Sequence, residues 1–267
     1  MPRLGVVGLV SLDRVDGGLP RLGGAPFYAA RALRLLGHPA VLATKVADED
    51  RHRLNALGLP VVARQAERTI AFRIENREEG RLMALDELGA AWTPEDVRGW
   101  LGSALAGAGW VHAGALTRAD FPAETLAALR RGRRLSLDGQ ALVRPARQGE
   151  IAFDAEFDRE VLRQVDVLKL SENEADILSL APNDRSLKTL GVPEIVITLA
   201  HRGSIVYADG LAEHVATRPV ESADPTGAGD VFMAAYASFR LRRHGPPSAA
   251  RLATQAAHAL LSEWRGR

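Results

Sequence analysis

Short runs of apolar residues alternate along this chain with longer alanine- and leucine-rich segments, in which apolar residues recur at helical spacing. Continuous apolar strands separated by helices are typical of a parallel sheet that helices cover on both faces. We therefore expect a doubly wound α/β fold with a mostly parallel sheet. The expected strands are residues 4–10, 41–46, 110–115, 135–138, 165–170 and 195–199, and the clearest expected helices are residues 25–36, 51–57 and 249–264.

One region breaks this alternation. Residues 69–75 and 81–86 have mixed polarity and are joined by a polar, glycine-ended segment, which predicts a β-hairpin at about 69–86. On its own, a hairpin inserted in an α/β chain is more often a decoration than a lid. No repeat, low-complexity tract or linker divides the sequence, so we expect a single domain over residues 1–267 with this small appendage.

The composition excludes several kinds of partner and site. The net charge is +1, so we expect no nucleic-acid partner and no membrane-surface partner. No apolar run approaches the length of a membrane span, and Asp13 interrupts the first apolar run too early for a signal peptide, so a cytoplasmic protein is expected. The absence of cysteine excludes disulfides, thiolate metal sites and thiol nucleophiles.

A glycine turn leads into an apolar helix near the C-terminal end. The turn contains Thr226, Gly227, Ala228 and Gly229, and Asp230 follows it. The first amides of a helix have no acceptor inside the helix and lie at its positive end, so this turn is a candidate site for an anion such as a phosphate. Asp230 is then either a helix cap or a base that collects a proton beside that anion.

Other candidate residues stand where open α/β sheets bind ligands, beyond the carboxyl ends of strands. They are Asp13, Gly23, Gly24, Tyr28, Asp138, Gln140, Glu174, Thr198 and Gly203. Taken singly, most of them are explained equally well as turn formers or, for Glu174 with Ser171, as a capping box. The sequence has no P-loop, dinucleotide fingerprint, nucleophile elbow or histidine pair at metal spacing.

Two motifs together resemble the ribokinase-like (PfkB) family of sugar and nucleoside kinases. The string DPTGAGD at 224–230, followed by VFMAAYA, matches the second signature of that family. The segment from Gly23 and Gly24 to Gly37 keeps the spacing of the first signature, with Tyr28 in place of the usual asparagine. The string DGQALVR at 138–144 resembles the version in the inositol-kinase-like branch and in some archaeal nucleoside kinases more than that of fructokinases. The resemblance implies a ribokinase-like fold, with the hairpin as a reduced lid over the acceptor.

The resemblance also implies a role for each matching residue. Asp230 would be the catalytic base, and the backbone of Gly227, Ala228 and Gly229 would be the anion hole. The acceptor would be bound by Asp13, Gly23, Gly24, Tyr28, Asp138 and Gln140, and the nucleotide by Thr198, Gly203, Thr226, Gly227 and Gly229. Glu174 would orient Mg²⁺ through water, and a monovalent cation is a further expectation near Asp224 and Thr226.

The expected function is therefore transfer of the γ-phosphoryl of ATP to a hydroxyl of a small sugar or polyol, with Mg²⁺ as cofactor. Two alternatives stay open. One is a nucleoside kinase of the same family. The other is a non-catalytic nucleotide sensor, suggested by departures from the family pattern at Tyr28, Ser171 and Ala200. A homodimer is a further expectation, because lids of this family often serve as dimer contacts.

Overall fold

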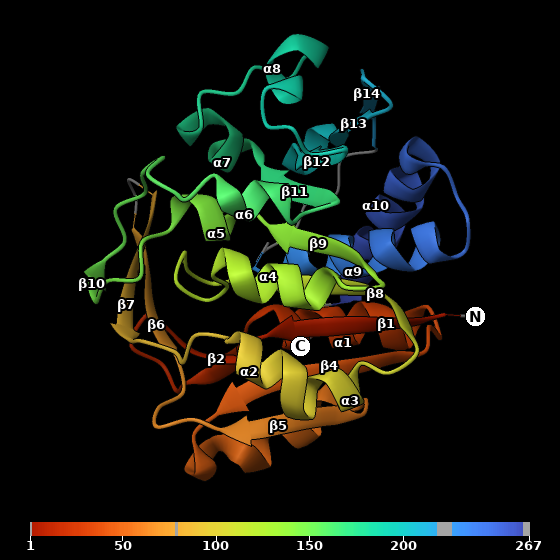
Figure 1. The fold of residues 1–267 in the computed structure, drawn as a ribbon. Helices are drawn as coiled ribbons and strands as arrows, with labels where there is room; N and C mark the ends of the chain where they lie inside the picture. The colour runs from red at the N-terminus through yellow and green to blue at the C-terminus, as the bar shows by residue number, and fades with distance from the viewer. Residues whose placement is uncertain (1, 78–79, 218–225, 264–267) are drawn as a thin grey trace.

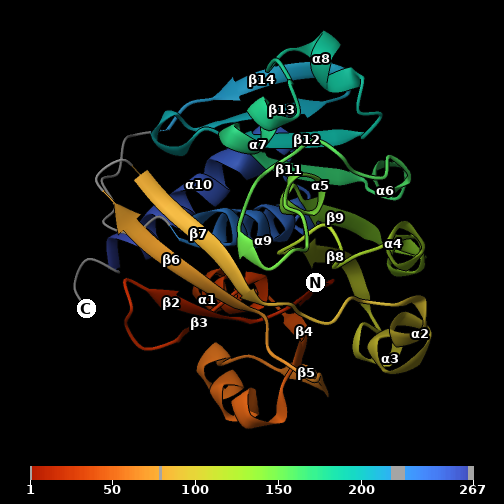
Figure 2. The same ribbon diagram turned by 90° about the vertical axis from the view of Figure 1, so that its left-hand side faces the viewer.

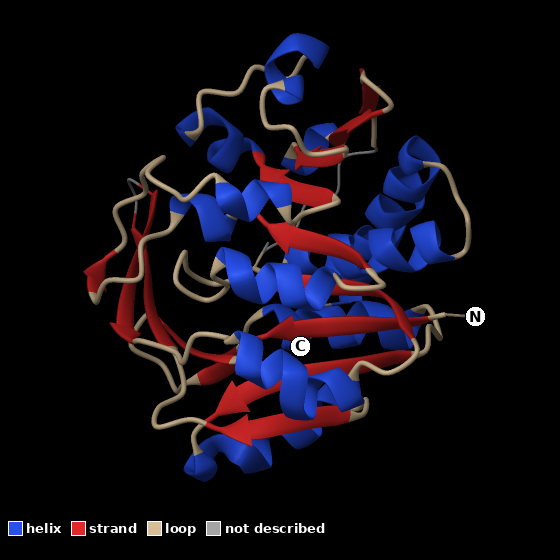
Figure 3. Ribbon diagram, viewed as in Figure 1, coloured by secondary structure: helices blue, strands red, loops and turns tan. Residues whose placement is uncertain are grey.

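A nine-stranded sheet forms the centre of the part of the chain that the computed structural model describes, residues 2–77, 80–217 and 226–263 (Figures 1 and 3). The strand order is β14-β13-β12-β11-β9-β8-β1-β4-β5, and the strands from β12 to β5 pair in parallel. β13 and β14 extend one edge as antiparallel strands. The strands are β1 (Arg3–Gly8), β4 (Ala40–Val46), β5 (Val61–Gln65), β8 (Ala108–Gly114), β9 (Arg134–Asp138), β11 (Val167–Ser171), β12 (Glu194–Thr198), β13 (Ser204–Ala208) and β14 (Leu211–Val215).

Helices cover both faces of this sheet because its strands are apolar on both sides. In β1, Val6 packs with α1, α9 and α10, whereas Val7 belongs to the core on the opposite face, with α4 (Figure 1). The helices are α1 (Ala25–Leu35), α2 (Pro94–Asp96), α3 (Gly102–Ala104), α4 (Ala123–Arg130), α5 (Gln140–Val143), α6 (Glu160–Arg163), α7 (Glu172–Ile177), α8 (Asp184–Lys188), α9 (Ala228–Leu241) and α10 (Pro246–Glu263), with the short helical turns η1 (Asp48–Leu57), η2 (Val97–Leu101) and η3 (Ala200–Arg202). The prediction of a doubly wound α/β fold is confirmed.

A second, five-stranded sheet lies across the carboxyl ends of the central strands (Figure 2). Its order is β10-β7-β6-β2-β3, for β2 (Ser11–Val15), β3 (Arg21–Gly23), β6 (Ala71–Arg77), β7 (Gly80–Glu87) and β10 (Gly149–Glu150). The hairpin expected at about 69–86 corresponds to β6 and β7, which pair antiparallel. The sequence analysis did not foresee the other three strands, which are short and carry little pattern. We call this five-stranded sheet the lid sheet.

None of the helices in the described ranges combines the length and the apolar composition that a membrane span requires.

Candidate active site

The carboxyl ends of the central strands bring polar residues from distant parts of the chain to one edge of the sheet. His112 lies in β8, Asp138 ends β9 and Lys169 lies in β11. All three are buried, at 0%, 1% and 4% exposure. Asp230, in the first turn of α9, is half-buried beside them. This edge is where an open α/β sheet is expected to bind its ligand.

The glycine turn before α9 has the conformation that the sequence requires. Gly227 caps the helix with φ 77°, a left-handed conformation that strains any residue with a side chain. A Cβ atom on Gly227 would lie 2.1 Å from the ring of Tyr28, which packs against the turn from α1. The first bond inside the helix runs from the Val231 amide to the Gly227 carbonyl (3.0 Å), so the preceding amides have no acceptor within the helix.

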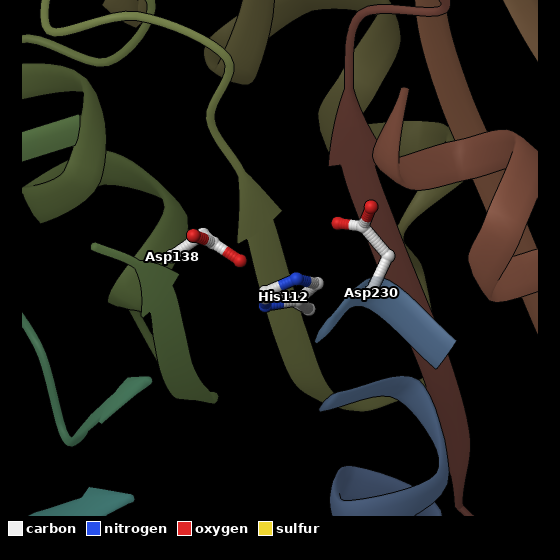
Figure 4. A group of neighbouring side chains, drawn as sticks. All are labelled: His112, Asp138 and Asp230. Carbon is white, nitrogen blue, oxygen red and sulfur yellow. The ribbon is translucent and has the colours of Figure 1, made fainter. Parts of the chain in front are cut away.

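Asp230 stands next to a second carboxylate and a histidine (Figure 4). One side-chain atom each of His112, Asp138 and Asp230 lies within 4.8 Å of the others. Burial and, next, the charge of Asp138 raise the pKa of Asp230 to about 7, although Lys169 and Arg144 lower it. A carboxyl group with a pKa near neutrality can both take up and release a proton at physiological pH.

His112 is held as a neutral ring. Its Nδ1 lies 3.1 Å from the hydroxyl of Ser136, which also accepts a hydrogen bond from Trp110 Nε1 at 2.8 Å. Burial lowers the pKa of His112 to about 4. Its three-residue cluster with Asp138 and Asp230 is a poor cation site, because the Lys169 ammonium donates to Asp138 Oδ2 at 3.3 Å and already neutralises it.

Glu174 forms the capping box that the sequence allowed. Its amide donates to Ser171 Oγ (3.2 Å), and its Oε2 accepts from the Ser171 amide (2.7 Å). Burial raises the pKa of Glu174, Lys169 opposes that effect and Asp138 reinforces it. The cap fixes a buried carboxylate close to the carboxyl end of β11. That placement fits a carboxylate that orients hydrated Mg²⁺, which remains a prediction.

Two glycines directly before α1 allow close contacts with the strand β2 and the residues before it. Asp13 lies in β2 and is 9% exposed, so it is not the solvated loop residue that its sequence context alone suggested. A Cβ atom on Gly23 would lie 2.2 Å from Asp13 Oδ2. A Cβ on Gly24, which has φ 84°, would lie 2.2 Å from the Leu9 carbonyl oxygen. Gly23 therefore leaves room for this carboxylate, and Gly24 leaves room for the backbone of Leu9.

Gln140 lies at the start of α5, directly after β9. Its backbone amide donates a hydrogen bond to Asp138 Oδ1 at 3.3 Å. Its side-chain Oε1 is buried and accepts no hydrogen bond within the described part of the chain. Such an oxygen can accept a hydrogen bond from a ligand hydroxyl.

A cavity of about 420 Å³ adjoins the glycine turn. Predicted nucleotide residues Thr198, Gly203 and Gly229 line it, together with Ala228. Phe232 of α9 and Ala257 of α10 give it apolar walls. Its volume is within the range of small-molecule sites, which start at roughly 300 Å³. The sequence analysis did not identify the α10 part of this cavity.

Ala200, at the rim of this cavity, is a strained residue. It stands where the family pattern has glycine, and its φ is 49°. A left-handed conformation costs a residue with a Cβ atom roughly 1–2 kcal/mol in the folded state. Glycine avoids this strain, but it also raises the conformational entropy of the unfolded chain, which offsets part of the gain in stability. We expect Ala200→Gly to raise the free energy of unfolding by up to about 1 kcal/mol in urea titrations. Ala127→Gly, in the helix α4, should instead lower it by about 1 kcal/mol; equal effects of the two changes would contradict the assignment of strain.

The lid sheet contacts the glycine turn directly. Arg81 of β7 donates from Nη2 to the hydroxyl of Thr226 at 2.9 Å. The structure thus brings together the predicted residues of the turn, the lid side and the ends of β9, β11 and β12. Asp224, the other residue expected near a monovalent cation, lies outside the described residues.

Sequence reasoning missed three buried charged or polar groups of the site: His112, Arg144 and Lys169. For Lys169 a signal was present, because it interrupts the apolar run of β11, where a charged residue is rarely buried without a partner. The same signal was present for His112, which interrupts the apolar run of β8, and Arg144 ends the string DGQALVR that resembles the family.

Comparison with known proteins agrees with this geometry. The sequence model described as pfkB family carbohydrate kinase matches residues 11–264. Cytidine kinase of Thermococcus kodakarensis is 27% identical over 97% of this chain and 96% of its own. Inositol 3-kinase of Zea mays is 32% identical over 40% of this chain and 27% of its own.

A solved pyrophosphate-dependent kinase in the ribokinase family, complexed with a pyrophosphate analog and myo-inositol, is 26% identical. It covers 97% of this chain and 95% of its own, with a TM-score of 0.81. The predicted similarity to the inositol-kinase-like branch is thereby supported. The chain belongs to the pfkB family of carbohydrate kinases.

Proposed function

We propose that this kinase transfers the γ-phosphoryl group of ATP to a hydroxyl of a sugar or polyol, with Asp230 as the general base. The observation that carries the proposal is the position of Asp230. Its carboxyl group lies in the first turn of α9, next to the glycine turn, and its pKa of about 7 suits proton uptake at neutral pH. Gly227 is the N-cap of α9, and no side-chain cap hydrogen bond forms there, so the alternative role of Asp230 as a helix cap is wrong.

In this proposal, the carboxylate of Asp230 takes the proton of the acceptor hydroxyl. The hydroxyl oxygen forms a bond to the γ-phosphorus as the bond from that phosphorus to the ADP oxygen breaks. The amides of Gly227, Ala228 and Gly229 bind the equatorial oxygens of the migrating group, where negative charge is spread. Bound Mg²⁺ would neutralise charge on the donor phosphates, with Glu174 orienting it through water.

The acceptor side of the site supports a polyhydroxyl compound. Asp13 places a nearly buried carboxylate on the lid side, and a carboxylate can accept hydrogen bonds from two adjacent hydroxyls. Gln140 adds a buried acceptor without a partner in the described residues. The complex of the pyrophosphate-dependent relative with myo-inositol supports the same class of acceptor. A nucleoside acceptor is the second candidate, favoured by the likeness to cytidine kinase over nearly the whole chain.

The donor side supports a nucleotide. The cavity of about 420 Å³ has apolar walls and opens onto Ala228 and Gly229, so a nucleoside can occupy it while its phosphates reach the turn. Inorganic pyrophosphate would leave this cavity unused. The relative with the pyrophosphate analog makes pyrophosphate the competing donor.

A donor and acceptor panel tests this function. With ATP and Mg²⁺ we expect ADP release in the presence of polyols such as inositols or of hexoses, and no turnover with pyrophosphate. Inositols should raise Tm more than cytidine or adenosine does, because only the bound acceptor stabilises the folded state. Turnover with pyrophosphate and not ATP would refute the donor. Stronger stabilisation and turnover with nucleosides would refute the acceptor class. ATP binding without ADP release for any acceptor would indicate a sensor.

A further inference from the structure

Lys169 has no role in the function proposed above, yet its ammonium lies against the glycine turn. A Cβ atom on Gly229 would lie 2.7 Å from Lys169 Nζ and 3.1 Å from Cε. With glycine at position 229 the ammonium lies against the turn without displacement, whereas a side chain there would require the end of Lys169 to shift. The second glycine of the turn therefore leaves space for a positive charge beside the predicted anion hole.

The ammonium is enclosed by acidic groups from three elements. It donates to Asp138 Oδ2 of β9 at 3.3 Å, and the side chains of the pair are 5% and 1% exposed. Burial alone would lower the pKa of Lys169, but the charges of Asp138, Glu174 and Asp230 raise it above the ordinary lysine value. Lys169 is therefore a permanently charged cation at neutral pH, although no solvent reaches it freely.

Two cations stand among the three acidic groups of this cluster. Asp138, Glu174 and Asp230 can supply three negative charges, and Lys169 and Arg144 supply two positive ones. Of the two cations, Arg144 lies near Phe72 of the lid sheet, whose ring centre is 5.6 Å from the guanidinium. Its Nη1 donates to the Leu116 carbonyl at 3.2 Å, and its buried Nε has no hydrogen-bond partner among the described residues. Lys169 is the one that lies at the turn.

An ammonium has three N–H groups, and within the described residues Asp138 accepts from one of them. A buried ammonium whose other two N–H groups have no acceptor is energetically costly, so a further acceptor at this place is favoured. The most favourable acceptor at this place is a phosphoryl oxygen, since the amides of the turn would hold the same group.

We propose that Lys169 is a catalytic residue, the fixed cation that contacts the transferred phosphoryl group beside Gly229. This inference rests on the proposed site of phosphoryl transfer, but it concerns any donor that places a phosphate there, nucleotide or pyrophosphate. Lys169 would neutralise charge that builds on the phosphoryl oxygens during transfer, and it would do so without reorganisation because Asp138 already orients it.

Kinetics of three variants test this role. We expect Lys169→Met to lower kcat/KM for the donor about 100-fold, within the range for loss of a charged hydrogen bond, and to leave the acceptor KM within about threefold. Lys169→Arg should recover roughly a tenth of the wild-type value, because it restores the charge with altered geometry. Lys45→Met is the matched control: Lys45 also forms an ion pair, with Asp96 at 2.6 Å, but away from the turn. An unchanged donor kcat/KM in folded Lys169→Met would overturn the proposal.

A second measurement needs no variant of Lys169 and no turnover. The chain has three lysines, Lys45, Lys169 and Lys188, so selective ¹⁵N labelling gives three side-chain amine signals. A saturating non-hydrolysable ATP analogue that keeps the γ-phosphoryl group, or inorganic pyrophosphate, should shift the Lys169 signal and leave the other two unchanged, with Lys45→Met and Lys188→Met used for assignment. A Lys169 signal that does not respond to either bound ligand would refute the proposal. If the signal shifts but no acceptor is phosphorylated, the proposed function fails and the phosphate contact stands.

Discussion

Replacement of Asp230 by asparagine is expected to lower kcat at least about 100-fold, the lower range for loss of a general base. Asparagine has nearly the same shape, and no side-chain cap hydrogen bond of α9 is lost, so the fold and the glycine turn should persist. It cannot take up the proton of the acceptor hydroxyl. Initial rates of ADP release at saturating donor and acceptor measure the effect, and circular dichroism checks the fold.

The matched control is Asp209→Asn, which removes a carboxylate from an exposed turn between β13 and β14. Asparagine tolerates the left-handed conformation of that position, so activity and stability should stay close to wild type. Near-full activity of folded Asp230→Asn would show that the carboxylate is not the base, and another group would then have to deprotonate the acceptor.

The same group predicts the acid limb of the pH profile. Because the pKa of Asp230 is raised to about 7, the base is protonated below that pH, and kcat/KM should fall as the pH drops through 7.

The raised pKa of Asp230 also affects the free energy of unfolding. The folded state retains a proton that the unfolded state releases near pH 4, so this group favours folding below pH 4 and that contribution is lost as the pH rises to 7. Asp230→Asn should therefore raise Tm more at pH 8 than at pH 4.5, which thermal denaturation at both pH values measures.

The sequence predicted strands best where the burial of a strand in the fold produces a recognisable pattern of apolar residues. Parallel central strands are buried on both faces, so 195–199, in which Thr198 is the one polar residue, stands out as an apolar run, and β12 lies there. β13 is also an apolar run, but it pairs antiparallel with β12. The residues of a buried strand do not indicate whether it runs parallel or antiparallel to its neighbour. β3 and β10 are only 3 and 2 residues long, and pairing within the lid sheet, not propensity, makes them strands.

The site was predictable where glycine or a family motif marks the backbone, and not where side chains meet across strands. Gly227 and Gly24 have the positive φ angles that their motifs suggested. The cluster of Lys169 with Asp138 joins residues 31 positions apart, and their contact depends on β9 and β11 being neighbours in the sheet. Strand order is set by the packing of the whole domain, so a single sequence does not reveal such a pair.

Replacement of Gly227 by alanine is expected to lower kcat by about 100-fold or more, the effect of losing one donor of an anion hole. The φ of 77° strains the new residue, at a cost of roughly 1–2 kcal/mol. The added Cβ would also lie 2.1 Å from the Tyr28 ring, so the turn or the ring must move. Either movement changes the direction of the amides that bind the phosphoryl group. Steady-state kinetics and urea titration measure the two effects separately.

Two further variants, Gly107→Ala and Tyr28→Ala, distinguish the backbone strain of an alanine at positive φ from the steric collision of the new Cβ with the Tyr28 ring. Gly107 has φ 75°, and a Cβ there meets no atom within 4 Å, so its replacement should cost stability alone and leave kcat unchanged. If the collision with Tyr28 moves the turn, Tyr28→Ala should restore part of the kcat lost in Gly227→Ala, a coupling that two independent sites would not show. Full activity of Gly227→Ala would contradict the anion hole itself. Rescue would instead show that the tyrosine, present where the family has asparagine, acts on the reaction through the glycine that it covers.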